Sequence, residues 1–403
     1  MSMLILYQKK RAAIDWSFLS SLPSYLTYAR ASSGTYFGVD GLLKTAADNE
    51  PRFEYDPVTH EPLGLLLEQQ ITNSLPRSQD ITAWGQTGSP TRTNNESGAP
   101  DGSDTWNRFT RTTTSPSYIS RSVIKSAAST PAVLSFYAKK GSVGNYVAAR
   151  IQGAYPNRVD TVFNLDAGTT GSITIGGSGF SGTSSGIKHI GNGVYRCWVA
   201  ISTSDTKDTF YIALSANSTG STQVDATDTA ADSNAYFWGM QVELNSMRPS
   251  SYIPTIDTPV TRAADSLSTT NISWFNATQG AVVVQFIIPN QIQTASQLAD
   301  MGSYQICNIQ ANLKAGTYSP ALYTTNTYPI NSIGKAGFSY NSSSRALCLN
   351  GGVVASSIAA PTFGNTLCLG HTSTVSQHLN GYLRAFKYYN RALSSSELQR
   401  ITI

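Results

Sequence analysis

Short apolar runs separated by turn-forming residues limit the fold of this chain more than any other feature of its sequence. Between residues 76 and 255 the runs alternate apolar with polar residues and are bounded by clusters of Gly, Ser and Asn. This is the pattern of strands in an antiparallel sheet. We therefore predict an antiparallel sandwich, with strands at 133–138, 146–151, 161–165, 172–175, 194–202, 210–214 and 236–243.

A second all-β domain is predicted at 265–403. The continuous apolar run at 281–288 is typical of a buried strand. Further on, Asn350-Gly351 supplies the positive φ angles that a tight hairpin turn needs. The sequence thus favours two sandwiches in tandem, an all-β fold class.

Two further signals mark the limits of the second domain. Residues 256–264 lack periodicity and contain Pro259, so we interpret them as a linker. Near the end of the chain, Ser394 and Glu397 have the spacing of a capping box, which predicts a short C-terminal helix.

The beginning of the chain differs from the rest. Residues 1–30 are predicted to form a segment of their own, with a short helical piece around 12–21 that Pro23 ends. Because such a segment is too small to bury its own core, it should dock on something larger. Residues 31–75 are predicted to follow as a turn-rich β module leading into the first sandwich.

Composition excludes several classes of protein. Only 13% of the 403 residues are charged, yet 40% are hydrophobic and fall in periodic runs, which argues against disorder. The net charge of +4 is spread along the chain, so nucleic-acid binding is not expected. No apolar run reaches the ~20 residues that span a bilayer, so we expect no membrane insertion. Four widely separated cysteines indicate reduced thiols in a cytosol.

The stretch 54–61 (EYDPVTHE) is the main candidate for catalysis, because it is similar to the acidic strand of sandwich-type glucanases. In those enzymes a nucleophile and an acid flank one bond from one face of a strand. Here Pro57 interrupts the strand, and the odd spacing of Glu54 and Glu61 would place them on opposite faces. A solvated turn is therefore the favoured interpretation over a catalytic pair, and we do not predict an enzyme.

No cofactor or metal is predicted. The histidines lack metal-ligand spacing, and neither a nucleophile elbow nor a phosphate-binding loop occurs. The loop at 99–104 could hold a structural Ca²⁺ through Asp101 together with Glu243, but a plain Asp-Gly turn is the favoured alternative.

Sugar-binding sites need aromatic faces and short polar groups on loops. The candidate carbohydrate contacts lie in turn-rich stretches or predicted loops: Trp84, Trp106, Tyr155, Tyr328 and His371. For each of them ordinary packing, or for His371 an exposed loop position beside His378, is the alternative. The tryptophans in or beside strand patterns are expected in the core instead: Trp198, Trp238 and Trp274.

Several motifs resemble those of tailed-bacteriophage virion structural proteins. The opening motifs are TYARASSGTYF at 27–37, PRFEYDP at 51–57 and GLLLE at 64–68. The closing motifs, similar to the end of the carbohydrate-binding-like jelly roll in that family, are WGMQVE at 238–243, PSSYIPT at 249–255 and TRAAD at 261–265. The last domain resembles the concanavalin A-like, laminin G-type lectin fold, through the hairpin at 347–352, the strand at 367–370 and the closing strand and helix at 379–397.

This resemblance implies a tail or head fibre, spike or decoration protein on the virion surface, assembled in the host cytoplasm, commonly as a homotrimer. Residues 1–30 would dock on other virion proteins, and the lectin-like sandwiches would bind host-surface polysaccharide through many weak contacts. Two alternatives remain: a capsid or tail decoration protein that cements its neighbours without a sugar ligand, and a polysaccharide depolymerase.

Overall fold

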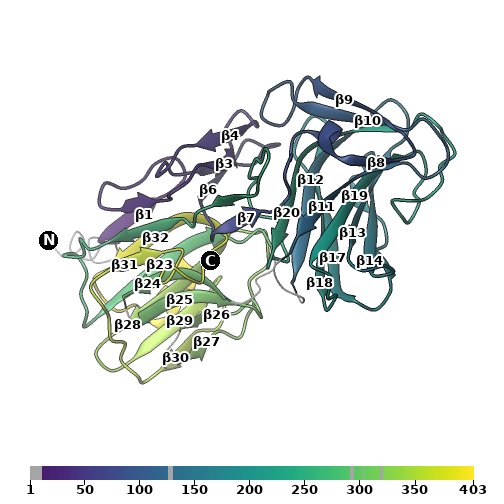
Figure 1. Ribbon diagram of the computed structural model, residues 1–403. Helices are drawn as coiled ribbons and strands as arrows, with labels where there is room; N and C mark the ends of the chain where they lie inside the picture. The colour runs from purple at the N-terminus through teal and green to yellow at the C-terminus, as the bar shows by residue number, and fades with distance from the viewer. Residues whose placement is uncertain (1–10, 126–129, 291–294, 303, 318–320) are drawn as a thin grey trace.

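The regular structure is almost entirely β, as predicted, and forms two sandwiches (Figure 1). This computed structural model describes residues 11–125, 130–290, 295–302, 304–317 and 321–403. Residues 1–10, part of the expected anchoring segment, therefore lie outside the described residues.

The first sandwich packs two sheets, named here after their central strands. The β12 sheet has the order β17 (Phe180–His189), β18 (Val194–Thr203), β12 (Ala132–Lys140), β20 (Asn234–Leu244), β10 (Trp106–Thr110) and β9 (Thr91–Glu96), with β7 (Ile71–Asn73) and β21 (Val260–Arg262) beyond β20. The β13 sheet has the order β15 (Thr169–Thr170), β14 (Arg158–Asn164), β13 (Tyr146–Gln152), β19 (Thr209–Asn217), β11 (Tyr118–Ile124) and β8 (Gly85–Thr87), with β16 (Thr174–Gly176) paired to β14. Each strand predicted in this sandwich is confirmed as a strand. The core between the two sheets contains fully buried side chains such as Phe136 and Phe237.

The second sandwich also packs two sheets. The β23 sheet has the order β30 (Ala355–Ser357), β29 (Arg345–Leu349), β28 (Gly334–Tyr340), β23 (Gly280–Ile287), β32 (Gly381–Tyr389), β6 (Pro62–Leu67) and β5 (Phe53–Tyr55), with β1 (Ile14–Ser17) paired to β32. The β24 sheet has the order β2 (Thr27–Ala29), β22 (Ser266–Thr269), β31 (Leu367–Leu369), β24 (Ala295–Met301), β25 (Tyr304–Gln310), β26 (Ala315–Thr317) and β27 (Leu322–Tyr323).

The remaining elements are short. Strands β3 (Gly34–Phe37) and β4 (Leu43–Ala46) form a separate hairpin, and a 3-10 turn, η1, spans Ile81–Ala83. The predicted C-terminal helix is α2 (Ser395–Ile401), with the capping box of Ser394 and Glu397 in place. The predicted turn is confirmed as well, because Asn350 and Gly351 both have positive φ.

The early strands belong to the second sandwich, which is therefore built from both ends of the chain. Strand β1 pairs with β32, β2 with β22, and β6 with β32. The expected helix around 12–21 is wrong: Trp16 is buried and stacks on Phe386 with ring centroids 5.3 Å apart, while Asp15 faces outward to Lys387. That alternation suits an added strand rather than a helix.

The first sandwich is inserted between β6 and β22 of the second. The chain leaves through β7 and returns through β21, and these two strands pair with each other. The expected linker at 256–264 therefore contains a strand, because β7 satisfies its backbone groups in a two-stranded ribbon.

A β-bulge in β20 decides which side chains of the β12 sheet face outward. Gly239 has a φ of +58°, and the pairing with β12 shifts register there. Trp238, expected in the core, consequently packs in a separate buried cluster with Tyr137 and Tyr252, whereas Met240 is in the core between the two sheets. Beyond the bulge Glu243 points outward, toward the second sandwich.

Asp265 is a fully buried carboxylate at the junction of the two sandwiches. It accepts hydrogen bonds from the Tyr28 hydroxyl at 2.5 Å and from Arg52 Nη2 at 2.6 Å. The backbone N–H of Glu68 donates to it at 2.7 Å, and Arg30 Nη1 lies 3.3 Å away. A buried carboxylate in this position holds four separate backbone segments together.

We predict that Asp265→Ala lowers the free energy of unfolding by about 3–5 kcal/mol, because it leaves the buried Arg30 without a counterion and Arg52 with Glu68 alone. Urea denaturation followed by tryptophan fluorescence measures the effect. The matched control is Asp257→Ala, which removes a largely exposed partner of Arg77 and should cost less than about 1 kcal/mol. Equal stability of the two variants would contradict the central role of Asp265.

We also predict that a chain beginning at Ala31 loses the cooperative folding of the second sandwich. It lacks four buried side chains, Trp16, Phe18, Leu26 and Tyr28, each worth roughly 1.5–3 kcal/mol. A chain beginning at Arg11 keeps them all and serves as the control. Thermal unfolding and dye binding to exposed apolar surface distinguish the two, and a full-length-like melting curve for the shorter chain would refute the prediction.

Candidate functional site

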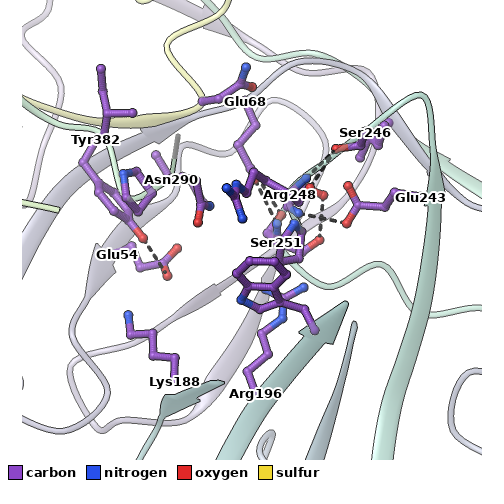
Figure 2. A pocket seen from close by; sticks show the side chains of 18 of the residues that line it. Glu54, Glu68, Lys188, Arg196, Glu243, Ser246, Arg248, Ser251, Asn290 and Tyr382 are labelled. Atoms are coloured by element: carbon purple, nitrogen blue, oxygen red, sulfur yellow. Dashed lines mark hydrogen bonds between the residues drawn. The ribbon is translucent and has the colours of Figure 1, made fainter. Parts of the chain in front are cut away.

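A cavity of about 430 Å³ lies between the two sandwiches and is called the interdomain cavity here (Figure 2). One wall is the outer face of the β12 sheet. The opposite wall is the outer face of β5, β6 and β32 in the β23 sheet. The loop at 246–251 lines a further side.

Strands β17, β18 and β20 place the side chains of the first wall. Arg196 and Trp198 flank Cys197, whose side chain is in the core, so both point outward. Lys188 is the direct cross-strand partner of Arg196. On β20, Glu243 reaches the same wall and accepts hydrogen bonds from Gln241 Nε2 at 2.5 Å and from the N–H of Ser250 at 2.8 Å.

The second wall follows from the alternation of β6. Leu65 and Leu67 are buried in the second core, so Leu66 faces the cavity, beside Tyr382 of β32. The Tyr382 hydroxyl donates to Glu54 Oε1 of β5 at 3.3 Å. Figure 2 shows this pair across the open centre of the cavity from Glu243.

Trp198 is held between a glycine and an arginine. A Cβ added at Gly186, its cross-strand partner, would lie 2.4 Å from the indole, so the ring lies directly over that glycine. The Arg248 guanidinium lies 4.8 Å from the ring centroid, and its Nη1 donates to Ser184 Oγ at 3.4 Å. This packing fixes both the indole and the guanidinium at the edge of the cavity.

The cavity carboxyl groups differ in charge. Burial and, after it, the nearby Glu68 carboxylate raise the pKa of Glu54 to about 7, although Lys188 and Arg52 oppose them. Burial likewise raises the pKa of Glu243. The hydrogen bond from Ser250 and the charge of Arg196 oppose this effect only in part, so the pKa is about 7. Burial acts on Glu68 too, but Arg262 and Arg52 outweigh it and hold the pKa of Glu68 at about 2.

The sequence-predicted carbohydrate contacts do not meet in this cavity. Four of them are buried and therefore do not offer a face to a sugar, contrary to the prediction. Their polar atoms are engaged internally: Trp84 with the carbonyl of Arg77, Trp106 with the carbonyl of Gly98, Tyr328 with the carbonyl of Ser332, and His371 with the N–H of Leu267. Tyr155 is 81% exposed but does not line the cavity, so its role as a sugar contact stays a prediction.

Two residues of the cavity were misassigned from sequence. Glu54 was expected in a solvated turn but is buried, because the sandwiches close over it; only Asp56 to His60 form the predicted turn. Trp198 was expected in the core, although the alternation along 194–202 puts it opposite Cys197 and could have indicated the outer face. His378, expected in an exposed loop, is buried near His371.

The loop at 99–104 is the predicted Asp-Gly turn. Asp101 Oδ1 accepts hydrogen bonds from the N–H of Ser103 at 3.0 Å and from its Oγ at 2.6 Å. Within the described residues, no group of three His, Cys, Asp or Glu side chains is arranged to hold a metal ion. Nor does any helix in the described part of the chain have the length and apolarity to cross a membrane.

Comparison with known proteins gives weak likenesses only. No protein-family model and no curated protein matches the chain. The Ruminococcus gnavus IT-sialidase CBM40 bound to alpha2,3 sialyllactose is similar to 31% of this chain, over 82% of its own, with 15% identity and a TM-score of 0.27. A Trypanosoma rangeli sialidase in complex with the inhibitor DANA is similar to 77% of this chain but only 61% of its own, with 10% identity and a TM-score of 0.28. At these TM-scores the likenesses carry no argument about function.

We predict that the pH dependence of stability reports Glu54 and Glu243. Their pKa in the folded protein, about 7, lies above the ordinary 4.5, so the folded state binds more protons between these values. Their contribution to stability is therefore greatest below about pH 4.5 and is lost as the pH rises to about 7. Urea unfolding at a series of pH values across this range measures the free energy of unfolding. This free energy should decrease less with pH in Glu54→Gln and Glu243→Gln than in the wild type, whereas Glu61→Gln, at an exposed position, should keep the wild-type pH dependence.

Proposed function

We propose that this chain is an adhesive protein that binds a saccharide in the interdomain cavity and acts on the surface of a tailed-phage particle. The observation that carries the binding proposal is the cavity itself, which lies at a domain junction and has about 430 Å³ of space. Ligand pockets of roughly 300–1,000 Å³ at such junctions are typical of small-molecule sites.

The lining of the cavity supports a polar ligand with an apolar face. Tyr382 and Leu66 present apolar surface, while Asn290, Asn331 and Asn380 bring amide groups from loops of the second sandwich. Amides both donate and accept hydrogen bonds, which suits sugar hydroxyls. Because strands of both sandwiches form the walls, the site is largely preformed, and little conformational entropy is lost on binding.

The carboxyl groups favour binding over hydrolysis. Both oxygens of Glu68 are engaged, Oε1 by the N–H of Ser251 at 2.8 Å and Oε2 by its hydroxyl at 2.7 Å. Glu243 Oε1 already accepts two hydrogen bonds. A glycosidase needs a second carboxylate free to act as nucleophile or base; Glu68 has both oxygens engaged, and Glu243 has one.

A depolymerase remains the second candidate because of Glu54. A buried carboxyl with a pKa of about 7 can stay protonated at neutral pH, which is the property of a general acid. Release of new reducing ends from host polysaccharide by the wild-type protein, lost in Glu54→Gln, would establish this activity.

The virion setting rests on the resemblance of the motifs at 27–37, 51–57, 64–68, 238–243, 249–255 and 261–265 to phage structural proteins. On the same ground we propose a homotrimer that docks on other virion proteins. Since residues 14–17 and 27–29 are strands of the second sandwich, we assign the docking role to the residues before Arg11. Comparing the full chain with one that begins at Arg11 for incorporation onto particles tests this part.

We predict that Trp198→Ala weakens binding of host-surface polysaccharide at least about tenfold, a loss of ~1.4 kcal/mol, because it releases Arg248 and removes one wall of the cavity. The control is Tyr155→Ala, which removes an exposed ring outside the cavity and should bind as the wild type does. Surface plasmon resonance on immobilised polysaccharide measures both, after unfolding curves show that each variant is folded.

The opposite effects of the two substitutions would place the sugar-binding site elsewhere. If Tyr155→Ala abolished binding and Trp198→Ala did not, the sugar would bind at the loop after β13 rather than in the cavity. If neither the wild type nor the variants bound polysaccharide while the protein still coated particles, the chain would be a cementing protein.

A further inference from the structure

The first wall of the interdomain cavity brings positive charges together. Lys188 and Arg196 are directly opposite each other on β17 and β18, a pairing of like charges that is unfavourable in a sheet. Neither forms an ion pair with any residue that the structure describes. Figure 2 shows both side chains pointing from these strands toward the open centre.

The guanidinium groups of Arg196 and Arg248, beside Lys188, are held by aromatic rings and hydrogen bonds. Arg196 lies over the Tyr137 ring at 5.4 Å and donates from Nη2 to Ser135 Oγ at 3.1 Å, while its buried Nε has no hydrogen-bond partner among the described residues. Arg248 is stacked on Trp198. A planar guanidinium fixed by stacking is well suited to bind an oxyanion through parallel N–H groups.

The cavity carboxyl groups do not neutralise these cations. Glu68 is paired with Arg52 at 2.8 Å and with Arg262 at 3.5 Å. Glu54 and Glu243, each with a pKa of about 7, are largely protonated in mildly acidic solution and half protonated near neutrality. The positive charge of the wall therefore exceeds the negative charge that faces it.

The buried network next to the cavity adds to this excess. Three guanidinium groups, those of Arg30, Arg52 and Arg262, share two carboxylates, Asp265 and Glu68. None of the side-chain nitrogens of Arg262 has a hydrogen-bond partner in the described part of the chain. Uncompensated charge is costly in a buried setting, so an anion bound nearby would be favoured.

We infer that the ligand of the interdomain cavity is an acidic saccharide, a sugar bearing a carboxylate or phosphate group, whose anionic group is bound by Lys188, Arg196 and Arg248. This inference rests on the proposed saccharide binding and adds the chemical class of the ligand. The amide-lined side of the cavity then holds the hydroxyls, and the cationic wall holds the acid.

The test uses full-length protein and a series of sugars that differ at one carbon: glucuronate, glucose 6-phosphate and glucose. Galacturonate and galactose form a second pair, and acetate and inorganic phosphate are the anions without a sugar. Ligand-observed NMR measures the dissociation constants. We expect at least one acidic sugar to bind about tenfold or more tightly than its neutral counterpart and than the simple anions, and the carboxylate and phosphate arms identify the acid.

Lys188→Gln should weaken binding of the acidic sugar about three- to tenfold and leave the affinity for the neutral sugar unchanged. Lys188 is exposed, so the substitution should not affect folding. The matched control is Lys207→Gln, at an exposed lysine on the loop between β18 and β19. It should change the affinity for neither sugar.

Three results would overturn the inference. If neutral sugars bind as tightly as the acidic ones and Trp198→Ala weakens both, the cavity binds saccharides without charge selection, and the proposed function survives alone. If acetate or phosphate binds as tightly as the acidic sugars, the site recognises an anion and not a saccharide. If no acidic sugar binds, the inference fails, and host-polysaccharide binding by the wild type decides separately whether the proposed function stands.

Discussion

The buried carboxylate of Asp265 is the interaction on which the rest of the architecture depends. It joins the side chains of Tyr28, Arg30 and Arg52 to the backbone of Glu68. Together with Asp265, these residues lie in four of the motifs that carry the family resemblance, which are spread from residue 27 to residue 265. The motifs therefore converge on one structural point, where the first sandwich is inserted into the second, and a charged cluster there specifies how the segments pair.

The interdomain cavity is a consequence of this insertion. The chain enters the first sandwich through β7 and leaves it through β21, which pair with each other. This two-stranded connection holds the outer face of the β12 sheet opposite the outer face of β6 and β32. Strand β20 adds its own contribution, because the bulge at Gly239 turns Gln241 and Glu243 away from the core and toward the second sandwich.

Charge distribution gives this junction its chemical character. Strands β17 and β18 supply Lys188 and Arg196 and the loop at 246–251 supplies Arg248, whereas the facing carboxyl groups either have a pKa raised to about 7 or are already paired. The Arg196 guanidinium keeps its orientation through the Tyr137 ring and Ser135. Lys188 and Arg196 thus place positive charge at the cavity wall, where a ligand can reach it.

The sequence by itself determined most of the local structure, with the strand at Ile14–Ser17, expected as a helix, as an exception. Alternation predicted the strands, Asn350-Gly351 the turn and Ser394 with Glu397 the helix cap, because each depends only on neighbouring residues. Only the tertiary structure decided that residues 14–67 complete the second sandwich, that Trp84 is buried, and that Glu54 lines a cavity. Pairing across hundreds of residues and the contact of two sheet faces set these features, and no local pattern contains that information.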